Sequence, residues 1–167
     1  KCVVDEAFID FVPDYKNHTM IPQVMDNDNL YVFYSLTKFF GIPALRLGAI
    51  IAPPLVIQKM AAAKDPWSVN LFAQVGGLAA LQDKEHMINT RILVDKERQY
   101  LYDKLTMLPG IYPHPGTANF LLINIEKSGL ACEKLTELLG KRGILVRDCS
   151  SFSRLGTKYI RIAVKNR

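Results

Sequence analysis

The sequence predicts an α/β fold, and three kinds of segment support this prediction. Short apolar segments have the length of strands, and they lie at 1–4, 30–34 and 45–52. Segments with helical spacing of apolar residues follow them, at 55–63, 68–81 and 83–108. Polar side chains come directly after the first two strands. Ligands of open α/β sheets bind at the carboxyl ends of strands, so a site is expected there.

A change of pattern after Pro109-Gly110 predicts a second unit. Its expected elements are strands at 118–125, 144–146 and 158–164, and a helix at 130–139. We therefore expect three parts: residues 1–82, a connecting helix at 83–108, and a small α+β unit at 109–167. Since the chain starts inside a strand without methionine and stops on a strand, we expect a fragment that lacks a closing helix.

The composition excludes several functional classes. Nearly half of the 167 residues (49%) are apolar, which is enough to bury a core, but no apolar run reaches the roughly 20 residues of a membrane span. The net charge of +5 arises from 21 basic residues scattered among 16 acidic ones, a pattern that makes nucleic acid an unlikely partner. The three cysteines have no metal-binding or disulfide spacing, so we expect reduced thiols, no metal site and a cytoplasmic protein.

The segment from Ser35 to Gly48 contains the groups on which the functional prediction depends. Ser35 follows an apolar strand, Thr37 and Lys38 come next, and Arg46 precedes another apolar run. The two hydroxyls can donate hydrogen bonds and the guanidinium can bind phosphate oxygens bidentately. A lysine amine can form an imine with an aldehyde. A phosphorylated aldehyde is therefore the expected ligand, which indicates pyridoxal 5'-phosphate.

Asp5, at the end of the first strand, strengthens this prediction. Taken alone it could cap a turn, but pyridoxal chemistry requires a carboxylate beside the pyridine nitrogen, whose proton lets the ring accept electrons. Phe8 can pack beside the cofactor ring or in the core. Phe39 and Phe40 are expected to place Lys38 in a less solvated environment. This lowers the pKa of its amine and favours imine formation.

A second motif competes for the same residues. Ser35-Leu-Thr-Lys38 also fits the S-x-x-K motif of penicillin-binding proteins, and Ser68-Val-Asn70 fits their second motif. No K-T-G follows, however, and this S-x-x-K leaves a strand and runs into Gly41-Ile-Pro43 rather than opening a long helix. The pattern therefore favours the phosphorylated aldehyde over acyl-enzyme chemistry.

Two arginines of the second unit are candidate substrate-binding residues. Arg147 and Arg161 each lie within or just after an apolar strand. One such arginine could protect a strand edge, but two together suggest binding of a substrate with two anionic groups. Asn119 is a third candidate, for which a role in a turn fits equally well.

Several motifs in this order resemble the fold-type I pyridoxal-phosphate enzymes of aminotransferase class I/II. They are Asp-Glu-Ala-Phe at 5–8, Ser-Leu-Thr-Lys at 35–38 and Arg46-Leu-Gly48. Further segments are similar to the histidinol-phosphate aminotransferase branch, and within it to decarboxylases of L-threonine O-3-phosphate: Pro-Trp-Ser-Val-Asn, Ala-Asn-Phe-Leu-Leu, Ile-Leu-Val-Arg147 and Tyr-Ile-Arg161-Ile-Ala-Val. The resemblance covers essentially the whole chain.

The resemblance implies a role for each candidate residue. Asp5 would pair with the pyridine nitrogen and Lys38 would form the imine. Ser35 and Arg46 would bind the cofactor phosphate, with Thr37 close to it. Arg147 and Arg161 would bind the anionic groups of the substrate. Members of the family usually have a tyrosine at the position of Phe8, so its hydroxyl donor to the cofactor is missing here.

The resemblance also implies how the chain relates to a whole enzyme. Residues 1–82 would be the C-terminal part of the cofactor-binding large domain, and 109–167 the small C-terminal domain without its last helix. The family's N-terminal half supplies further cofactor contacts, so we expect this chain alone to bind cofactor poorly and to be inactive. The complete enzyme would be a homodimer.

The resemblance leaves three functions open. The first is decarboxylation of L-threonine O-3-phosphate, a step of cobalamin biosynthesis that yields 1-amino-2-propanol O-2-phosphate. The second is transamination of the histidinol-phosphate type, since the bond that breaks depends on geometry that no sequence resolves. The third is a non-catalytic interaction domain that retains the fold.

Overall fold

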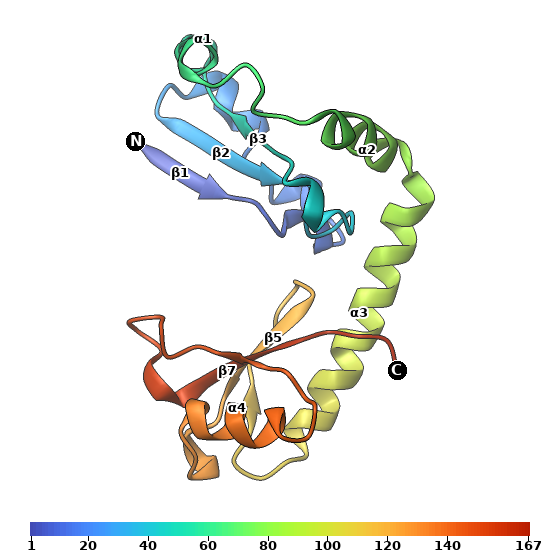
Figure 1. The fold of residues 1–167 in the computed structure, drawn as a ribbon, viewed down its shortest axis with the longest axis vertical. Helices are drawn as coiled ribbons and strands as arrows, with labels where there is room; N and C mark the ends of the chain where they lie inside the picture. Colours follow the sequence, from blue (N-terminus) through green and yellow to red (C-terminus); the bar gives the residue numbers. More distant parts are fainter. The chain divides into compact units, whose positions relative to one another are not determined.

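The computed structural model describes residues 1–167, which form two compact units joined within one long helix. Unit 1 comprises Lys1–Arg91 and unit 2 comprises Ile92–Arg167. The boundary lies inside α3, Lys84–Thr106, which is drawn in yellow-green in Figure 1. None of the helices combines the length and the apolar composition that crossing a bilayer requires.

The sheet of unit 1 has three strands, β1 (Cys2–Asp5), β2 (Leu30–Ser35) and β3 (Gly48–Ile51), in that order (Figure 1). β1 and β2 are parallel, whereas β2 and β3 are antiparallel. The third strand is shorter than the expected 45–52. A single 3-10 turn at Pro43–Leu45 and a left-handed residue, Arg46, take up its first part.

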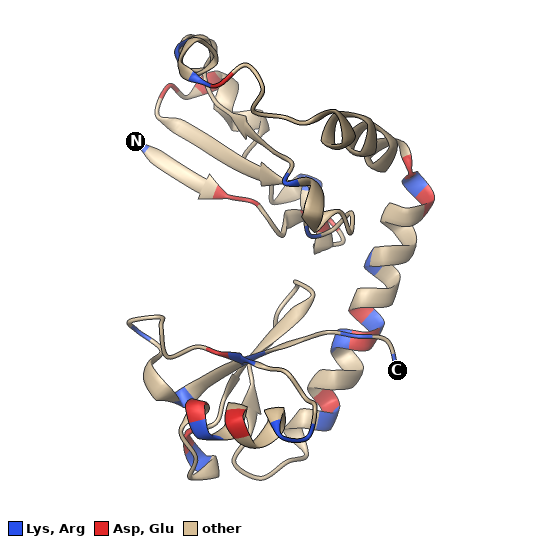
Figure 2. Cartoon of the chain, viewed as in Figure 1, with Lys and Arg blue, Asp and Glu red and all other residues tan.

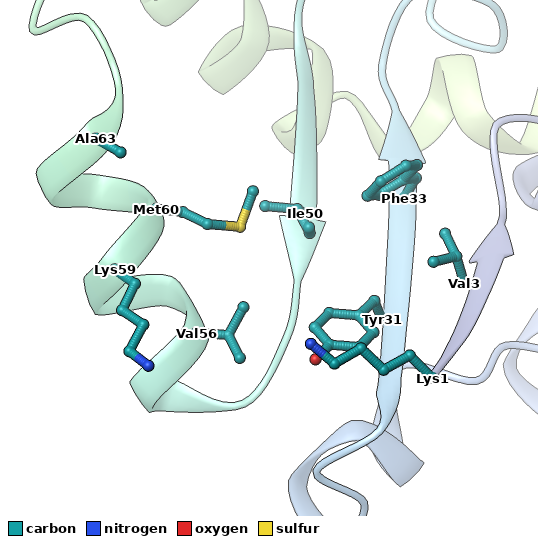
Figure 3. Close-up of a pocket in the computed structure, with 9 residues that line it drawn as sticks. All are labelled: Lys1, Val3, Tyr31, Phe33, Ile50, Val56, Lys59, Met60 and Ala63. Atoms are coloured by element: carbon teal, nitrogen blue, oxygen red, sulfur yellow. The ribbon is translucent and has the colours of Figure 1, made fainter.

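The two faces of this sheet differ in burial. Val4, Val32 and Ile51 pack on one face around Val24, with Leu30. The other face carries Val3, Tyr31, Phe33 and Ile50, and Phe33 is 47% exposed. Together with α1, Pro54–Ala63, this face lines an apolar pocket of about 520 Å³, shown in Figure 3. None of the predicted cofactor residues lines this pocket.

A second cluster in unit 1 is aromatic. Phe11, Phe39 and Phe40 are buried, and their rings meet edge to face at centroid distances of 5.1 and 5.2 Å. The segment between β1 and β2 forms three short 3-10 turns, at Ile9–Phe11, Tyr15–Asn17 and Pro22–Asp26.

The helices begin close to the expected residues, with one correction. α2 spans Leu71–Gln82, and its first turn is capped by Asn70, whose Oδ1 accepts a hydrogen bond from the Ala73 amide at 2.9 Å. The helix therefore begins three residues after the start of the expected segment 68–81, because Ser68 lies in the turn before it. Asp83 caps the start of α3 through the His86 amide at 2.9 Å. Figure 2 shows acidic and basic residues interleaved along α3.

Unit 2 has an antiparallel sheet in the order β4-β5-β7-β6, together with α4, Cys132–Gly140. The strands are β4 (Tyr112–Pro113), β5 (Phe120–Asn124), β6 (Arg147–Asp148) and β7 (Tyr159–Ala163). The expected strand at 144–146 was wrong. Ile144 and Leu145 are exposed, so the pairing with β7 starts only at Arg147.

The core of unit 2 lies between this sheet, α4 and the second half of α3. Its buried residues come mainly from β5 and β7, and partly buried side chains of α3 pack against them; the buried members are Leu121, Ile123, Ile125, Cys132 and Ile160. The alternation along β5 is that of a strand with one buried face. This core supports the strands that contain Arg147 and Arg161.

We expect Leu121→Ala to lower the free energy of unfolding by about 2–5 kcal/mol, since it removes a buried side chain and leaves a cavity. The matched control is Leu145→Ala, because Leu121 is 1% exposed and Leu145 is 90% exposed. The control should change stability by less than about 0.5 kcal/mol. Urea unfolding followed by circular dichroism measures both, and similar losses for the two variants would contradict this core.

Candidate cofactor and substrate site

Parallel pairing brings the carboxyl ends of β1 and β2 to one edge of the sheet. Asp5 is the last residue of β1 and lies opposite Phe33, and Ser35 is the last residue of β2. Because side chains alternate between faces, Asp5, Phe33 and Ser35 share one face. The Asp5 side chain is exposed, and its Oδ1 accepts a hydrogen bond from the Ala7 amide at 2.9 Å.

Buried acidic residues fix the loop that follows Asp5. The Glu6 side chain, 4% exposed, accepts hydrogen bonds from Thr19 Oγ1 at 2.7 Å and from the Met20 amide at 2.6 Å. Sequence reasoning did not identify this role. The signal was an acidic residue inside an otherwise apolar segment, since such residues are rarely buried without partners.

Asp10 joins the same loop to the second strand. Its Oδ2 accepts a hydrogen bond from the Tyr34 hydroxyl at 2.6 Å, and its backbone oxygen accepts one from Arg91 Nε at 2.7 Å. Burial raises the pKa of Asp10 above its ordinary value of 3.8, although Tyr34 and Arg91 both oppose the shift. Burial and the Asp10 carboxylate also raise the pKa of Tyr34, so its hydroxyl remains the donor.

The turn after β2 places two hydroxyls side by side. Ser35 Oγ and Thr37 Oγ1 are 2.8 Å apart, and Ser35 Oγ also accepts a weak hydrogen bond from the Thr37 amide at 3.3 Å. Thr37 is buried, whereas Lys38 is exposed. The expected shielding of Lys38 was wrong, because Phe39 and Phe40 turn into the aromatic core instead of lying against the amine.

Arg46 follows this turn with an unusual backbone. Its φ of 55° and ψ of 48° lie in the left-handed region, and it is the one residue other than glycine with a positive φ. Its guanidinium makes a single hydrogen bond, from Nη1 to the backbone oxygen of Pro43 at 2.9 Å. The other donors of this exposed guanidinium are available to a ligand.

The residues of unit 1 fit a phosphorylated aldehyde. Ser35 and Thr37 supply hydroxyl donors, Arg46 supplies guanidinium donors with no carboxylate partner, and Lys38 supplies an exposed amine. Asp5 supplies an exposed carboxylate at the same edge of the sheet as Ser35. Phe8 is half-buried and stacks on Phe11 at a centroid distance of 6.3 Å.

Unit 2 places its two candidate arginines directly opposite each other. Arg147 on β6 pairs in register with Arg161 on β7. Like charges at directly paired positions destabilise a sheet, so an anion bound to both would relieve their repulsion. The Arg161 guanidinium lies 4.8 Å from the centroid of the Phe120 ring, a distance at which a cation is attracted to a ring.

Asp148, next to Arg147, belongs to a network under β6. Its Oδ1 accepts hydrogen bonds from Cys132 Sγ at 3.0 Å and from the Ser150 amide at 2.7 Å. The hydrogen bond from Cys132 holds the pKa of Asp148 below its ordinary value, and burial raises the pKa of the Cys132 thiol. The network of Asp148, Cys132 and Ser150 therefore fixes the backbone beside Arg147. The three cysteines are free thiols, as expected.

The structure places the remaining candidate, Asn119, just before β5. Its backbone oxygen accepts a hydrogen bond from the Val164 amide at 2.9 Å, which extends the pairing of β5 with β7. Its half-buried side chain makes no hydrogen bond. Asp5, Ser35, Thr37, Lys38, Arg46 and Phe8 thus lie in unit 1, and Asn119, Arg147 and Arg161 lie in unit 2.

The chain belongs to the aminotransferase class I and II family, whose model matches residues 2–166. The α/β fold of the fold-type I enzymes is confirmed, and pyridoxal 5'-phosphate is the cofactor of this family. The site in unit 1 has the groups that this cofactor requires.

Individual relatives divide between two activities. A protein of Caldanaerobacter subterraneus subspecies tengcongensis, provisionally named threonine-phosphate decarboxylase, is 39% identical over 99% of this chain and 44% of its own length. The Salmonella typhimurium threonine-phosphate decarboxylase is 36% identical over 98% of this chain and 44% of its length. The Methanosarcina mazei histidinol-phosphate aminotransferase is 37% identical over 96% of this chain and 41% of its length.

A solved structure is similar over nearly the whole chain. The histidinol-phosphate aminotransferase from Clostridium acetobutylicum superposes with a TM-score of 0.90 and 28% sequence identity. The alignment covers 98% of this chain and 49% of that one. The chain therefore spans less than half the length of the curated relatives and the solved structure that it matches.

We expect Tyr34→Phe to destabilise unit 1 in a pH-dependent way. The folded-state pKa of Asp10 is raised, so the folded protein binds more protons than the unfolded one, and stability falls as the pH rises from 3.8 through the folded pKa. The variant loses a hydrogen bond to the ionised carboxylate. The loss should be about 1.5–3 kcal/mol near pH 7 and smaller near pH 4, where Asp10 is more often protonated.

Urea unfolding at the two pH values tests this expectation. Tyr112→Phe is the control, because the Tyr112 hydroxyl makes no hydrogen bond and its ring is 47% exposed. A loss of the same size at both pH values would show that the Tyr34 hydroxyl does not act on an ionised Asp10.

Proposed function

We propose that this chain is the C-terminal part of an enzyme that decarboxylates L-threonine O-3-phosphate to 1-amino-2-propanol O-2-phosphate, with pyridoxal phosphate as cofactor. The observation that supports this choice of substrate is the similarity to two proteins named threonine-phosphate decarboxylase, at 39% and 36% identity over nearly the whole chain. The proposal extends to the pathway, cobalamin biosynthesis, and to a cytoplasmic homodimer as the complete enzyme.

The chemistry of unit 1 supports the cofactor part of the proposal. The bound cofactor supplies an electron sink for the electron pair that remains when a bond at Cα breaks. The Lys38 amine holds the cofactor aldehyde, and the exposed Asp5 carboxylate holds a proton at the pyridine nitrogen. Ser35, Thr37 and Arg46 bind the phosphate with hydroxyl and guanidinium donors.

The paired arginines of unit 2 support the substrate part. L-Threonine O-3-phosphate has a carboxylate and a phosphate, and Arg147 and Arg161 offer two guanidiniums with no carboxylate partner. Asn119 supplies a neutral amide on the same sheet. Decarboxylation breaks the covalent bond between Cα and the carboxylate carbon and forms a covalent C–H bond at Cα. Carbon dioxide therefore leaves and one proton is taken up.

A histidinol-phosphate-type aminotransferase is the second candidate. It is favoured by the relative with 37% identity and by the TM-score of 0.90 to a solved enzyme of that name. The family's usual tyrosine would donate a hydrogen bond to the cofactor, and Phe8 cannot. The loss of this donor fits a member of the family that has moved away from ordinary transamination, so Phe8 favours the decarboxylase. Both candidates use the same residues for the cofactor.

Product analysis of the full-length protein with pyridoxal phosphate separates the two candidates. We expect carbon dioxide from L-threonine O-3-phosphate alone, in the absence of any keto acid. Histidinol phosphate with 2-oxoglutarate should give no glutamate. Lys38→Ala is the control and should abolish carbon dioxide release. Glutamate from the second mixture, with no carbon dioxide from the first, would establish the aminotransferase instead. An unchanged Lys38→Ala phenotype in cells would support a non-catalytic domain.

Substrate binding by the arginines is tested with Arg147→Lys and Arg161→Lys. Lysine keeps the charge but loses the bidentate geometry, so each variant should raise KM for L-threonine O-3-phosphate by about 10- to 100-fold. Arg142→Lys is the matched control, because Arg142 is exposed and makes no side-chain hydrogen bond. A rise in KM equal to that of the control would exclude the two arginines from substrate binding.

A further inference from the structure

The left-handed backbone of Arg46 needs an explanation, because this conformation is less favourable for a residue with a Cβ atom than for glycine. Residues in such conformations persist where the surrounding structure enforces them, and they are common at functional sites. The side chain of Arg46 makes one hydrogen bond, to Pro43 three residues earlier. Contacts of the neighbouring residues must therefore hold this backbone.

Helix α2 makes the first of these contacts through its cap residue. Asn70 Oδ1 accepts from the Ala73 amide at 2.9 Å, which caps the helix, while Asn70 Nδ2 donates to the backbone oxygen of Leu45 at 3.3 Å. The two ends of one amide thus join the first turn of α2 to the peptide group that precedes Arg46. The peptide that follows Leu47 is held separately, because its oxygen accepts from the Leu36 amide at 3.2 Å.

The glycines of α2 make the second contact. A Cβ atom added to Gly76 would lie 2.7 Å from Leu45 Cδ1, and one added to Gly77 would overlap Leu47 Cδ2. A side chain at either position would therefore require the leucine side chain opposite it to shift. The leucines on both sides of Arg46 thus pack against Gly76 and Gly77.

We propose that α2 holds the Arg46 loop in its left-handed conformation and so aims the guanidinium at the cofactor phosphate, with Asn70 as the positioning residue. This inference rests on the proposed phosphate-binding role of Arg46. Asn70 does not itself contact the cofactor. It acts through Leu45, while the side chains of Leu45 and Leu47 lie against Gly76 and Gly77 of α2.

The two bonds of Asn70 can be separated by substitution in the full-length protein. Asn70→Ser and Asn70→Asp keep a cap oxygen, since serine, aspartate and asparagine are comparable caps. Serine is too short to reach Leu45 and aspartate has no donor, so both lose the bond to its backbone oxygen. Gln74→Glu is the charge-matched control, because it adds a negative charge to α2 and leaves the Leu45 bond of Asn70 in place. It loses only the exposed hydrogen bond from Gln74 Nε2 to the backbone oxygen of Val69 at 3.1 Å.

Three measurements test the inference on each variant: thermal unfolding, amide exchange at Leu36 and Leu45, and equilibrium dialysis with pyridoxal phosphate and with pyridoxal. Because the cap is kept and one exposed hydrogen bond is lost, Asn70→Ser and Asn70→Asp should unfold within about 4 °C of the wild-type temperature and exchange faster at both amides. They should bind pyridoxal phosphate about three- to tenfold more weakly, the effect of one hydrogen bond, and bind pyridoxal unchanged. Gln74→Glu should match the wild type in amide exchange at Leu36 and Leu45 and in affinity for both ligands.

Two results would overturn the positioning role of Asn70. One is wild-type affinity for pyridoxal phosphate in both variants, and the other is an equal loss of affinity for pyridoxal, which would show a general structural effect. The Arg46→Met variant distinguishes failure of the positioning role of Asn70 from failure of the proposed phosphate-binding role of Arg46. If Arg46→Met binds pyridoxal phosphate as the wild type does, Arg46 is not a phosphate ligand, whatever the exchange rates of the Asn70 variants show.

Discussion

The parallel pairing of β1 with β2 is the constraint on which the candidate cofactor site depends. It aligns the last residues of two strands that are separated by a polar segment of more than twenty residues, so that Asp5 and Ser35 lie at one edge and on one face. The buried Glu6 and Asp10 side chains then hold the loop after β1 through hydrogen bonds. Without this register the carboxylate and the hydroxyls would not share a site.

Three of the eight arginines of the chain pair with a carboxylate, and five, with Arg142 and Arg154 among them, do not. Those with a structural role, Arg91, Arg98 and Arg167, each pair with a carboxylate. The three candidate ligand residues, Arg46, Arg147 and Arg161, have no carboxylate partner. Arg147 and Arg161 lie directly opposite each other on the neighbouring strands β6 and β7. Since guanidiniums at paired positions repel each other, an anion bound to both Arg147 and Arg161 would relieve their repulsion.

Local patterns predicted much of the fold. The approximate positions of β1, β2, α1, α2 and α3 follow from apolar periodicity and prolines, which act within a few residues. Prediction failed where tertiary contacts decide. The apolar residues Ile144 and Leu145 stay exposed, and strand pairing begins at Arg147, because β6 exists only where it meets β7.

The sequence by itself determined the residue types of the candidate site, their order and the family, because the chemistry of a phosphorylated aldehyde requires a lysine, a carboxylate and phosphate donors. Only the tertiary structure decided how these groups are held. The exposure of Lys38, the left-handed backbone of Arg46 and the double role of Asn70 depend on contacts between segments far apart in the chain. Such contacts leave no local pattern, since a turn or a cap has the same spacing whatever packs against it.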